Sequence, residues 1–386
     1  MKRIQSIAAA VGLGLSVAAA MHAQISSAVE FRVPKPPTVA VSDSGAFLAY
    51  ELHITNLTSA SMTLRRVEIL DVDANNAAVM SLADSVLLRA VARAVPVPPV
   101  QGAAAPAAAD RLRIAAGLRA YAYLWIPIDR NKTPANLKHR LTFERADSTM
   151  ETLDGAAITV ERSAVAISPP LRGEWAAFNG PSNASGHRRL VLALDGHVAS
   201  GQRFAIDFLQ VDSSNSSRRP GSDATKNANY YAYGNELLAV ADGIVVATKD
   251  SIPENVPGAN SRAVKIDLVT VGGNFVGIDI GQGKYALYAH VQPGSLRVKI
   301  GDRVKRGQIL ALLGNSGNST EPHVHFQVAD APSFLASEGV PYTTTFDVLG
   351  NCGIGGNPPA ITCTRHAPTA VQSGIPLQNE IVRFPR

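Results

Sequence analysis

The chain has 386 residues, of which 46% are hydrophobic and 17% charged, and it contains 31 glycines and 24 prolines. This composition excludes a mainly disordered chain, allows two or three domains, and favours β-rich folds over helical bundles. The net charge of +5 suits a protein that meets an anionic surface such as a cell wall. Nucleic-acid binding is disfavoured, because no Lys/Arg run with interleaved aromatic residues occurs.

Residues 1–23 have the pattern of a secretory signal peptide. Lys2 and Arg3 precede a run of small apolar residues, and the expected cleavage follows Ala23 or Ala20. The apolar run is shorter than the ~20 residues of a membrane span, so we expect no stable span after cleavage. The sequence therefore predicts an exported protein, either periplasmic or secreted.

Residues 28–167 alternate apolar and polar side chains in short runs that are separated by turn signals. The runs are Phe47 to Leu57, Met62 to Val72, Leu118 to Ile128 and Leu137 to Glu144. Period-two alternation of this kind predicts an antiparallel β-sandwich of the immunoglobulin-like type. The paired prolines of the segment 168–172 then indicate a linker to a second domain.

Residues 173–330 are again rich in short strands with glycines at the corners, which predicts a barrel-like or folded sheet. The segment 331–386 is interpreted as a Pro/Gly-rich C-terminal tail. It contains both cysteines of the chain, Cys352 and Cys363. Export would place them where a disulfide persists, whereas two cysteines alone cannot form a structural zinc site.

The motif HVHF, His323 to Phe326, is the main chemical signal in the second domain. Residues an even number apart share a face of a strand, so His323 and His325 lie on one side while Val324 and Phe326 face the core. Two histidines on a polar strand face are one explanation. A metal site is the other, and a glycine-rich turn before the motif and His290 in YALYAHV favour it.

Together these motifs resemble the LytM or lysostaphin-type zinc metallopeptidases of bacterial cell walls. The resemblance covers residues 173–330, includes the segments ADGIVV and KIGDRVKRGQILALLGNSG, and leaves out the N-terminal half. It implies a folded antiparallel sheet shaped as a half-barrel, a Zn²⁺ cofactor and hydrolysis of peptidoglycan peptides. The expected fold class is therefore all-β throughout.

The resemblance also implies roles for individual residues. Asp207 and His325 would be zinc ligands. His290 and His323 would be catalytic residues that orient and deprotonate the attacking water and stabilise the oxyanion. The chemistry is reasonable, because zinc makes water a stronger acid and neutral imidazoles can relay the proton.

The first metal motif, in RFAIDF, departs from the family pattern, because Arg203 replaces the histidine expected four residues before Asp207 on the same strand face. Arginine cannot ligate a metal, and a catalytic zinc normally has three protein ligands. Three outcomes are open. His187, or Gln202 through a bulge, completes the site; or Arg203 pairs with Asp207 in place of a metal; or zinc binds weakly through Asp207, His325 and waters.

These outcomes give two functional hypotheses. The first is an exported zinc metallopeptidase that hydrolyses peptide bonds of peptidoglycan cross-links. The alternative is a catalytically inactive LytM-like module that binds the cell wall or activates a separate hydrolase, such as a cell-wall amidase, and Arg203 favours it.

Overall fold

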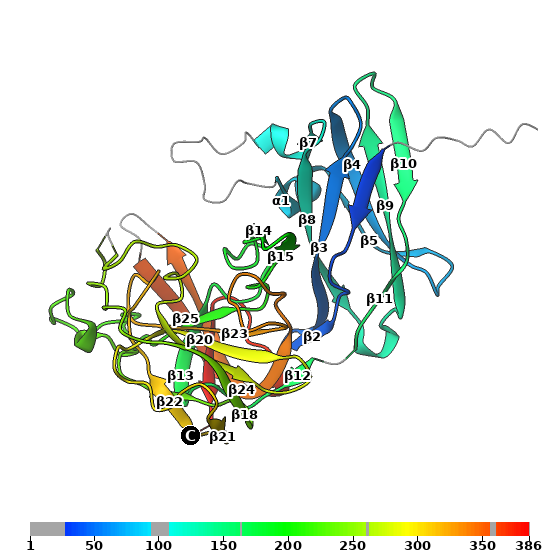
Figure 1. Cartoon of the computed structure of the whole chain (residues 1–386). Helices are drawn as coiled ribbons and strands as arrows, with labels where there is room; N and C mark the ends of the chain where they lie inside the picture. The colour runs from blue at the N-terminus through cyan, green and yellow to red at the C-terminus, as the bar shows by residue number, and fades with distance from the viewer. Residues whose placement is uncertain (1–27, 94–107, 163, 260–261, 356–359, 386) are drawn as a thin grey trace, which may run out of the picture.

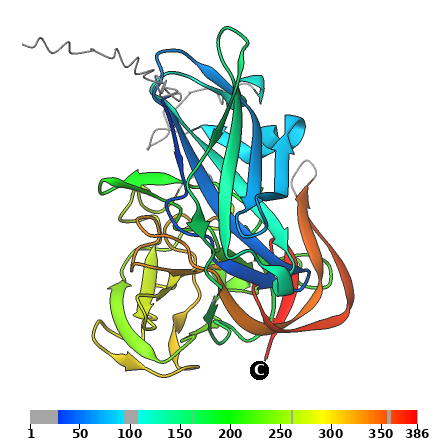
Figure 2. The same ribbon diagram turned by 90° about the vertical axis from the view of Figure 1, so that its right-hand side faces the viewer.

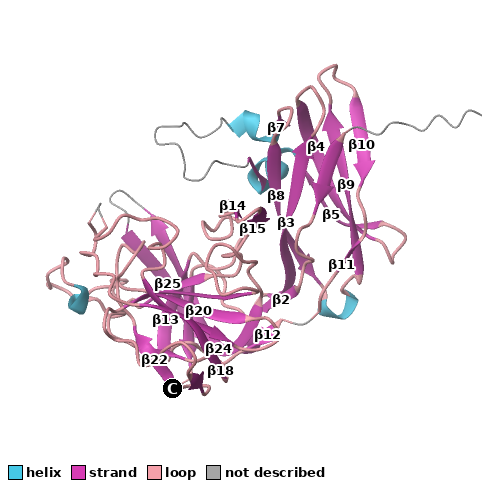
Figure 3. Ribbon diagram, viewed as in Figure 1, coloured by secondary structure: helices cyan, strands magenta, loops and turns pink. Residues whose placement is uncertain are grey.

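The computed structural model describes residues 28–93, 108–162, 164–259, 262–355 and 360–385. The predicted signal peptide, residues 1–23, lies outside this range. Strands dominate both halves of the chain and helices are few and short, which confirms the predicted all-β class (Figure 3). Within the described ranges, no helix is long and apolar enough to cross a membrane.

The N-terminal half consists of two antiparallel sheets that face each other (Figure 1). The first sheet contains β1 (Val29–Arg32), β2 (Val39–Ser42), β3 (Gly45–Asn56), β8 (Arg119–Ile128) and β6 (Val91–Arg93). The second contains β4 (Met62–Asp71), β5 (Ala77–Ala83), β7 (Arg113–Ile114), β9 (Asn136–Glu144), β10 (Met150–Asp154) and β11 (Ile158–Thr159). Helix α1 (Asp84–Ala90) joins β5 to β6, and short 3-10 turns occupy Ala108–Leu112 and Arg130–Lys132.

Alternation along the strands explains why these two sheets pack. In β9 every second side chain is buried, beginning with Leu137 and ending with Phe143. The buried side chains of both sheets form one apolar cluster, to which Leu48 on β3 and Val67 on β4 belong. The sandwich predicted from the period-two pattern therefore has the expected inner face.

The C-terminal half is organised around an eleven-stranded sheet. In spatial order its main path is β12 (Val165–Ala166), β24 (Tyr342–Gly355), β26 (Glu380–Phe384), β13 (Gly173–Phe178), β16 (Ile206–Leu209), β23 (Val324–Ala329), β20 (Tyr285–Val291), β19 (Asn274–Asp279), β18 (Gly243–Lys249) and β21 (Arg303–Val304). Strand β25 (Ala360–Gly374) pairs with β24. Two smaller pairs are β14 (Leu192–Leu194) with β15 (His197–Ala199), and β17 (Glu236–Leu238) with β22 (Ile309–Leu312); a 3-10 turn lies at Asn227–Asn229.

The segment 331–386, expected to be a tail, instead contributes three strands to this sheet. Strand β26 pairs with β13, next to β16. Phe346 on β24 and Phe384 on β26 are both 1% exposed, so the segment supplies part of the core. The Gly and Pro content concealed these strands, because the apolar residues that pack are separated by bulges and turns.

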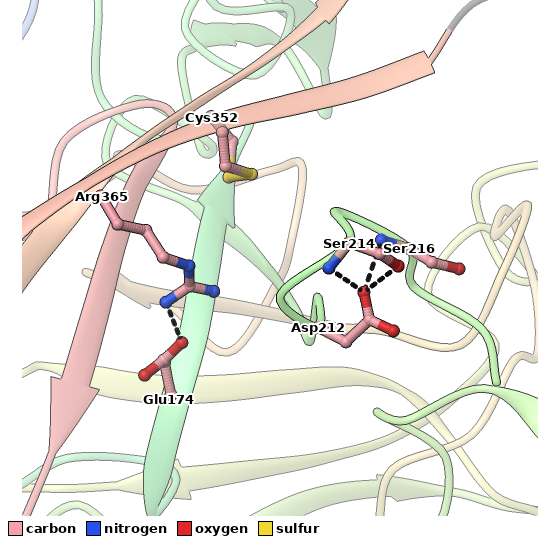
Figure 4. The surroundings of a disulfide bond; sticks show 7 residues. Glu174, Asp212, Ser214, Ser216, Cys352 and Arg365 are labelled. Carbon is pink, nitrogen blue, oxygen red and sulfur yellow. Dashed lines mark hydrogen bonds and ion pairs between the residues drawn. A yellow bond between two sulfur atoms is a disulfide. The ribbon is translucent and has the colours of Figure 1, made fainter. Parts of the chain in front are cut away.

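A disulfide closes the outer part of the β24–β25 hairpin. Cys352 and Cys363 face each other across the two strands and are bonded (Figure 4). Nearby, Arg365 on β25 forms an ion pair with Glu174 on β13 (Figure 4). The hairpin is thus joined within itself by a covalent bond and to the central sheet by a charge pair.

The two halves of the chain are packed against each other (Figures 1 and 2). Ala40 and Phe47 of the N-terminal half belong to the same buried cluster as the core of the second half. Ile167 and Leu171, at the predicted linker, are also buried in this cluster, so the segment 168–172 is not a free connection. The sandwich therefore forms part of the support for the second domain.

We predict that one buried histidine of the sandwich makes stability depend on pH. Burial lowers the pKa of His139 from 6.5 to about 4, and its Nε2 lies 2.8 Å from the Tyr50 hydroxyl. Between pH 6.5 and about 4, His139 therefore binds a proton in the unfolded chain but not in the folded chain. From pH 7 to pH 5 this lowers the free energy of unfolding by about 2 kcal/mol.

Urea unfolding of wild type and His139→Gln at the two pH values measures this effect. The decrease on acidification should be smaller in the variant by about 2 kcal/mol, whereas a variant of the exposed His366 should behave like wild type. An equal decrease in His139→Gln and wild type would contradict the assignment.

Candidate metal centre

The pairing of β16 with β23 places Asp207 directly opposite His325. The neighbouring residues of both strands, Phe208, Val324 and Phe326, point into the core and are at most 1% exposed. Since alternate residues of a strand face opposite sides, the buried apolar set forces the aspartate and the histidine onto the other face.

The side chains of His290 and His323 also lie near Asp207 and His325. Strand β20 pairs with β23 and aligns Ala289 with His325, so His290 lies at the edge of the cluster. The ring centroids of His290 and His323 are 4.7 Å apart, and Nε2 of His323 is 3.6 Å from Asp207 Oδ1. The four residues expected from the sequence, Asp207, His290, His323 and His325, therefore converge.

His187 is the fifth member of the group. It lies in an irregular segment, residues 181–190, and not on a strand. Its Nε2 is 3.4 Å from Asp207 Oδ2, and its ring centroid is 4.6 Å from that of His325. His187, Asp207 and His325 each offer one ligand atom, and these atoms lie within 4.8 Å of one another.

Hydrogen bonds fix the tautomer of His325. The Nε2 of Gln327 donates to the carbonyls of Gly201 and Phe334, at 3.1 and 3.3 Å, which identifies its Oε1 as an acceptor. Nε2 of His325 lies 2.8 Å from that oxygen and must therefore carry the hydrogen. With that hydrogen on Nε2, Nδ1 is the ring nitrogen that can ligate a metal, and it lies 3.1 Å from Asp207 Oδ1.

The same reasoning applies to the other two histidines. Nδ1 of His290 lies 2.8 Å from the Ser316 carbonyl, and Nδ1 of His323 lies 2.8 Å from the Glu321 carbonyl. A carbonyl oxygen only accepts, so both rings carry a hydrogen on Nδ1. Nε2 of each ring lies on the side away from that carbonyl, and Nε2 of His323 is 3.6 Å from Asp207 Oδ1.

The backbone around His290 is unusual and helps to aim its ring. His290 has φ +64°, a left-handed conformation that is rare for a residue with a side chain. A Cβ on the adjoining Gly273 would lie 2.5 Å from the backbone of Ser316. Only glycine allows this approach, which brings the Ser316 carbonyl to the imidazole.

The second oxygen of the Asp207 carboxylate, Oδ2, accepts a hydrogen bond from the Asn179 amide at 2.8 Å. Burial alone would raise the pKa of Asp207, but the nearby rings of His187, His323 and His325 lower it well below its usual value. The group is therefore an ionised carboxylate at neutral pH.

The two outlying histidines are neutral at the same pH. Burial lowers the pKa of His187 to about 4, although the Asp207 carboxylate opposes this shift. Burial also lowers the pKa of His290 well below its usual value, and the neighbouring His323 and His325 add to the effect. Neutral imidazoles keep the lone pairs that metal binding and proton transfer require.

The expectation that Arg203 shares a strand face with Asp207 is wrong. Strand β16 begins only at Ile206, and residues 201–204 form a turn. Arg203 points away from the cluster and donates to Glu51 at 2.9 Å and to the Gly339 carbonyl at 3.0 Å. The arginine therefore does not pair with Asp207 in place of a cation.

Two residues that support the site were not predicted from the sequence. Gln327 follows His325 by two positions on β23, so the same alternation rule that pairs His323 with His325 could have identified it. Asn179 follows β13 and meets Asp207 only through the pairing of β13 with β16, for which the sequence carried no signal.

Comparison with known proteins identifies the type of the C-terminal domain. Residues 228–335, which include His290, His323 and His325, match the model of Peptidase family M23. The glycyl-glycine endopeptidase ALE-1 of Staphylococcus capitis is 46% identical over 57 residues, 14% of this chain and 15% of the relative. The peptidoglycan DD-endopeptidase ShyA of Vibrio cholerae is 31% identical over 134 residues, 33% of this chain and 26% of the relative.

Solved structures of the same type are also similar. The catalytic domain of lysostaphin from Staphylococcus simulans is 21% identical with a TM-score of 0.24, over 44% of this chain and 88% of that chain. A zinc-containing peptidase from Vibrio cholerae is 15% identical with a TM-score of 0.19, over 79% of this chain and 83% of that chain.

The C-terminal domain is therefore a Peptidase family M23 domain of the LytM and lysostaphin type. The chain covers only 15% and 26% of the lengths of the two curated relatives. The match to the family model, residues 228–335, does not include the N-terminal sandwich.

We predict that His187 contributes to metal binding, although it lies outside the family match. In the full chain, His187→Ala should weaken zinc binding by at least about 100-fold, because it removes one of three ligand atoms. His197→Ala is the matched control, since His197 is an exposed residue of the adjacent hairpin. Competition with a chelator measures both affinities, and equal affinities would exclude His187 from the site.

Proposed function

We propose that the protein is a zinc metallopeptidase that hydrolyses peptide bonds in peptidoglycan cross-links, with zinc held by His187, Asp207 and His325. One observation carries the proposal. One ligand atom from each of the three residues lies within 4.8 Å of the other two, and Nδ1 of His325 lies 3.1 Å from Oδ1 of Asp207.

The residues present fit zinc. Two imidazole nitrogens and one carboxylate oxygen are a common donor set for a catalytic zinc, and they leave a fourth position open. The supporting hydrogen bonds from His325 to Gln327 and from Asn179 to Asp207 are of the kind that orients metal ligands. Zinc bound there would supply a Lewis acid that polarises the scissile carbonyl and makes water a stronger acid.

His290 and His323 would move the proton and stabilise charge. Nδ1 of each ring donates to a backbone carbonyl, which leaves Nε2 of each ring as the nitrogen available for proton transfer. One ring can accept the proton of the attacking water. After that transfer it can donate a hydrogen bond to the oxyanion or a proton to the leaving amine.

The substrate class rests on the relatives. The names of ALE-1 and ShyA describe a glycyl-glycine endopeptidase and a peptidoglycan DD-endopeptidase. We propose peptidoglycan peptides as the substrate of this chain too, because its net charge of +5 suits an anionic cell wall and its first 23 residues predict export. The non-catalytic module loses its main support, because Arg203 pairs with Glu51 and not with Asp207.

Hydrolysis of purified peptidoglycan by the zinc-loaded chain tests the proposal. His323→Ala and His290→Ala should each lower kcat by about 10²- to 10⁴-fold, because each removes a group that transfers protons or stabilises charge. Both variants should still bind zinc, since neither residue is a proposed ligand. Zinc binding without release of cleaved peptides by the wild type would instead support a binding module.

A further inference from the structure

The segment that carries His187 is anchored on the N-terminal sandwich. Asn183 donates through its amide to the Tyr123 carbonyl at 2.8 Å, and the Tyr123 hydroxyl donates to the Arg189 carbonyl at 3.0 Å. The Arg189 guanidinium also lies 4.9 Å from the centre of the Tyr123 ring. One tyrosine on β8 therefore contacts the chain on both sides of the histidine.

Arg188, which follows His187 directly, inserts into the sandwich. Its side chain is completely buried, and its Nη2 donates to the carbonyls of Tyr50 and Leu124 at 2.9 and 3.1 Å. These two carbonyls belong to facing residues of β3 and β8. The guanidinium also forms an ion pair with Glu51 on β3.

Glu51 joins this arginine to a second one. Its carboxylate, 2% exposed, also accepts from Nε of Arg203 at 2.9 Å, and Arg203 is further paired with Glu338. Arg188 follows His187 and Arg203 precedes Asp207, so one carboxylate of the N-terminal half holds the stretch between two metal-binding residues at both ends. Two arginines and two glutamates balance in charge.

Contacts within the C-terminal domain hold the part of the chain that precedes His187. The Ser185 hydroxyl donates to the Asn179 carbonyl at 2.7 Å, which holds the chain before the histidine. After the histidine, the side chains of Arg188 and Arg189 and the Arg189 carbonyl contact the sandwich. In the view of Figure 1 the following hairpin, β14–β15, also lies between the two halves.

We propose that Glu51 is a positioning residue of the metal centre, which acts through Arg188 to hold His187 beside Asp207. This inference rests on the proposed zinc site. Without the carboxylate, a buried guanidinium would lack its counter-charge, a state that favours its movement toward water. Such a movement displaces the peptide bond that Arg188 shares with His187. The N-terminal sandwich is then a structural part of the centre.

Zinc affinity of the full chain tests this role. Glu51→Gln should raise the Kd for zinc by at least about tenfold, as expected for a group that orients a ligand. Glu338→Gln is the matched control, because Glu338 pairs with Arg203 but has no bond to Arg188. Its Kd should stay within about twofold of wild type. Equal losses in both variants would overturn the proposal.

A double variant shows whether Glu51 acts through His187. In the His187→Ala background, Glu51→Gln should weaken zinc binding no further, because the ligand that it positions is absent. A further loss in that background as large as in wild type would refute the route through His187. If His187→Ala alone leaves zinc affinity unchanged, the proposed zinc site itself fails, which is a distinct result.

If Glu51→Gln does not fold, a milder variant tests whether the sandwich anchors the segment that carries His187. Tyr123→Phe removes only the hydroxyl that donates to the Arg189 carbonyl, with no change of charge. It should weaken zinc binding by about threefold to tenfold, the effect of one hydrogen bond. Folding is checked by circular dichroism of the metal-free protein. A folded Tyr123→Phe chain with wild-type zinc affinity would contradict anchorage by the sandwich.

Discussion

The chemistry of this protein depends on the pairing of β16 with β23. That pairing puts a buried carboxylate opposite an imidazole, while Phe208, Val324 and Phe326 fill the core behind them. A slip of one residue would turn the aspartate inward and the apolar side chains outward, so the buried set fixes the register. The remaining contacts at the site adjust ligands that this register has already brought together.

The centre is assembled from more of the chain than its catalytic motifs suggest. The family match spans residues 228–335, yet His187 and Asp207 precede it, and Arg188 beside His187 is bound by the N-terminal sandwich. The C-terminal strand β26 pairs with β13, which in turn pairs with β16, the strand that carries Asp207. The shared apolar cluster keeps the two halves in contact, and the hydrogen bonds from Arg188 to the sandwich depend on that contact.

Where a residue lay on a regular strand, the sequence was informative. Alternation placed His323 and His325 on one face, and the resemblance added Asp207 and His290. Arg203 was misplaced because the strand was assumed to begin before Ile206, and His187 could only be offered as a candidate because an irregular segment has no period. Contacts between distant segments, such as Asn179 with Asp207, depend on tertiary pairing that a single sequence does not contain.

The most direct measurement is a crystal structure of the full chain grown with zinc, with data collected at the zinc absorption edge. We expect an anomalous peak about 2.0 to 2.2 Å from Nε2 of His187, a carboxylate oxygen of Asp207 and Nδ1 of His325. A peak bound by other residues, or a cluster that keeps zinc out while Asp207 and His325 stay paired, would contradict it.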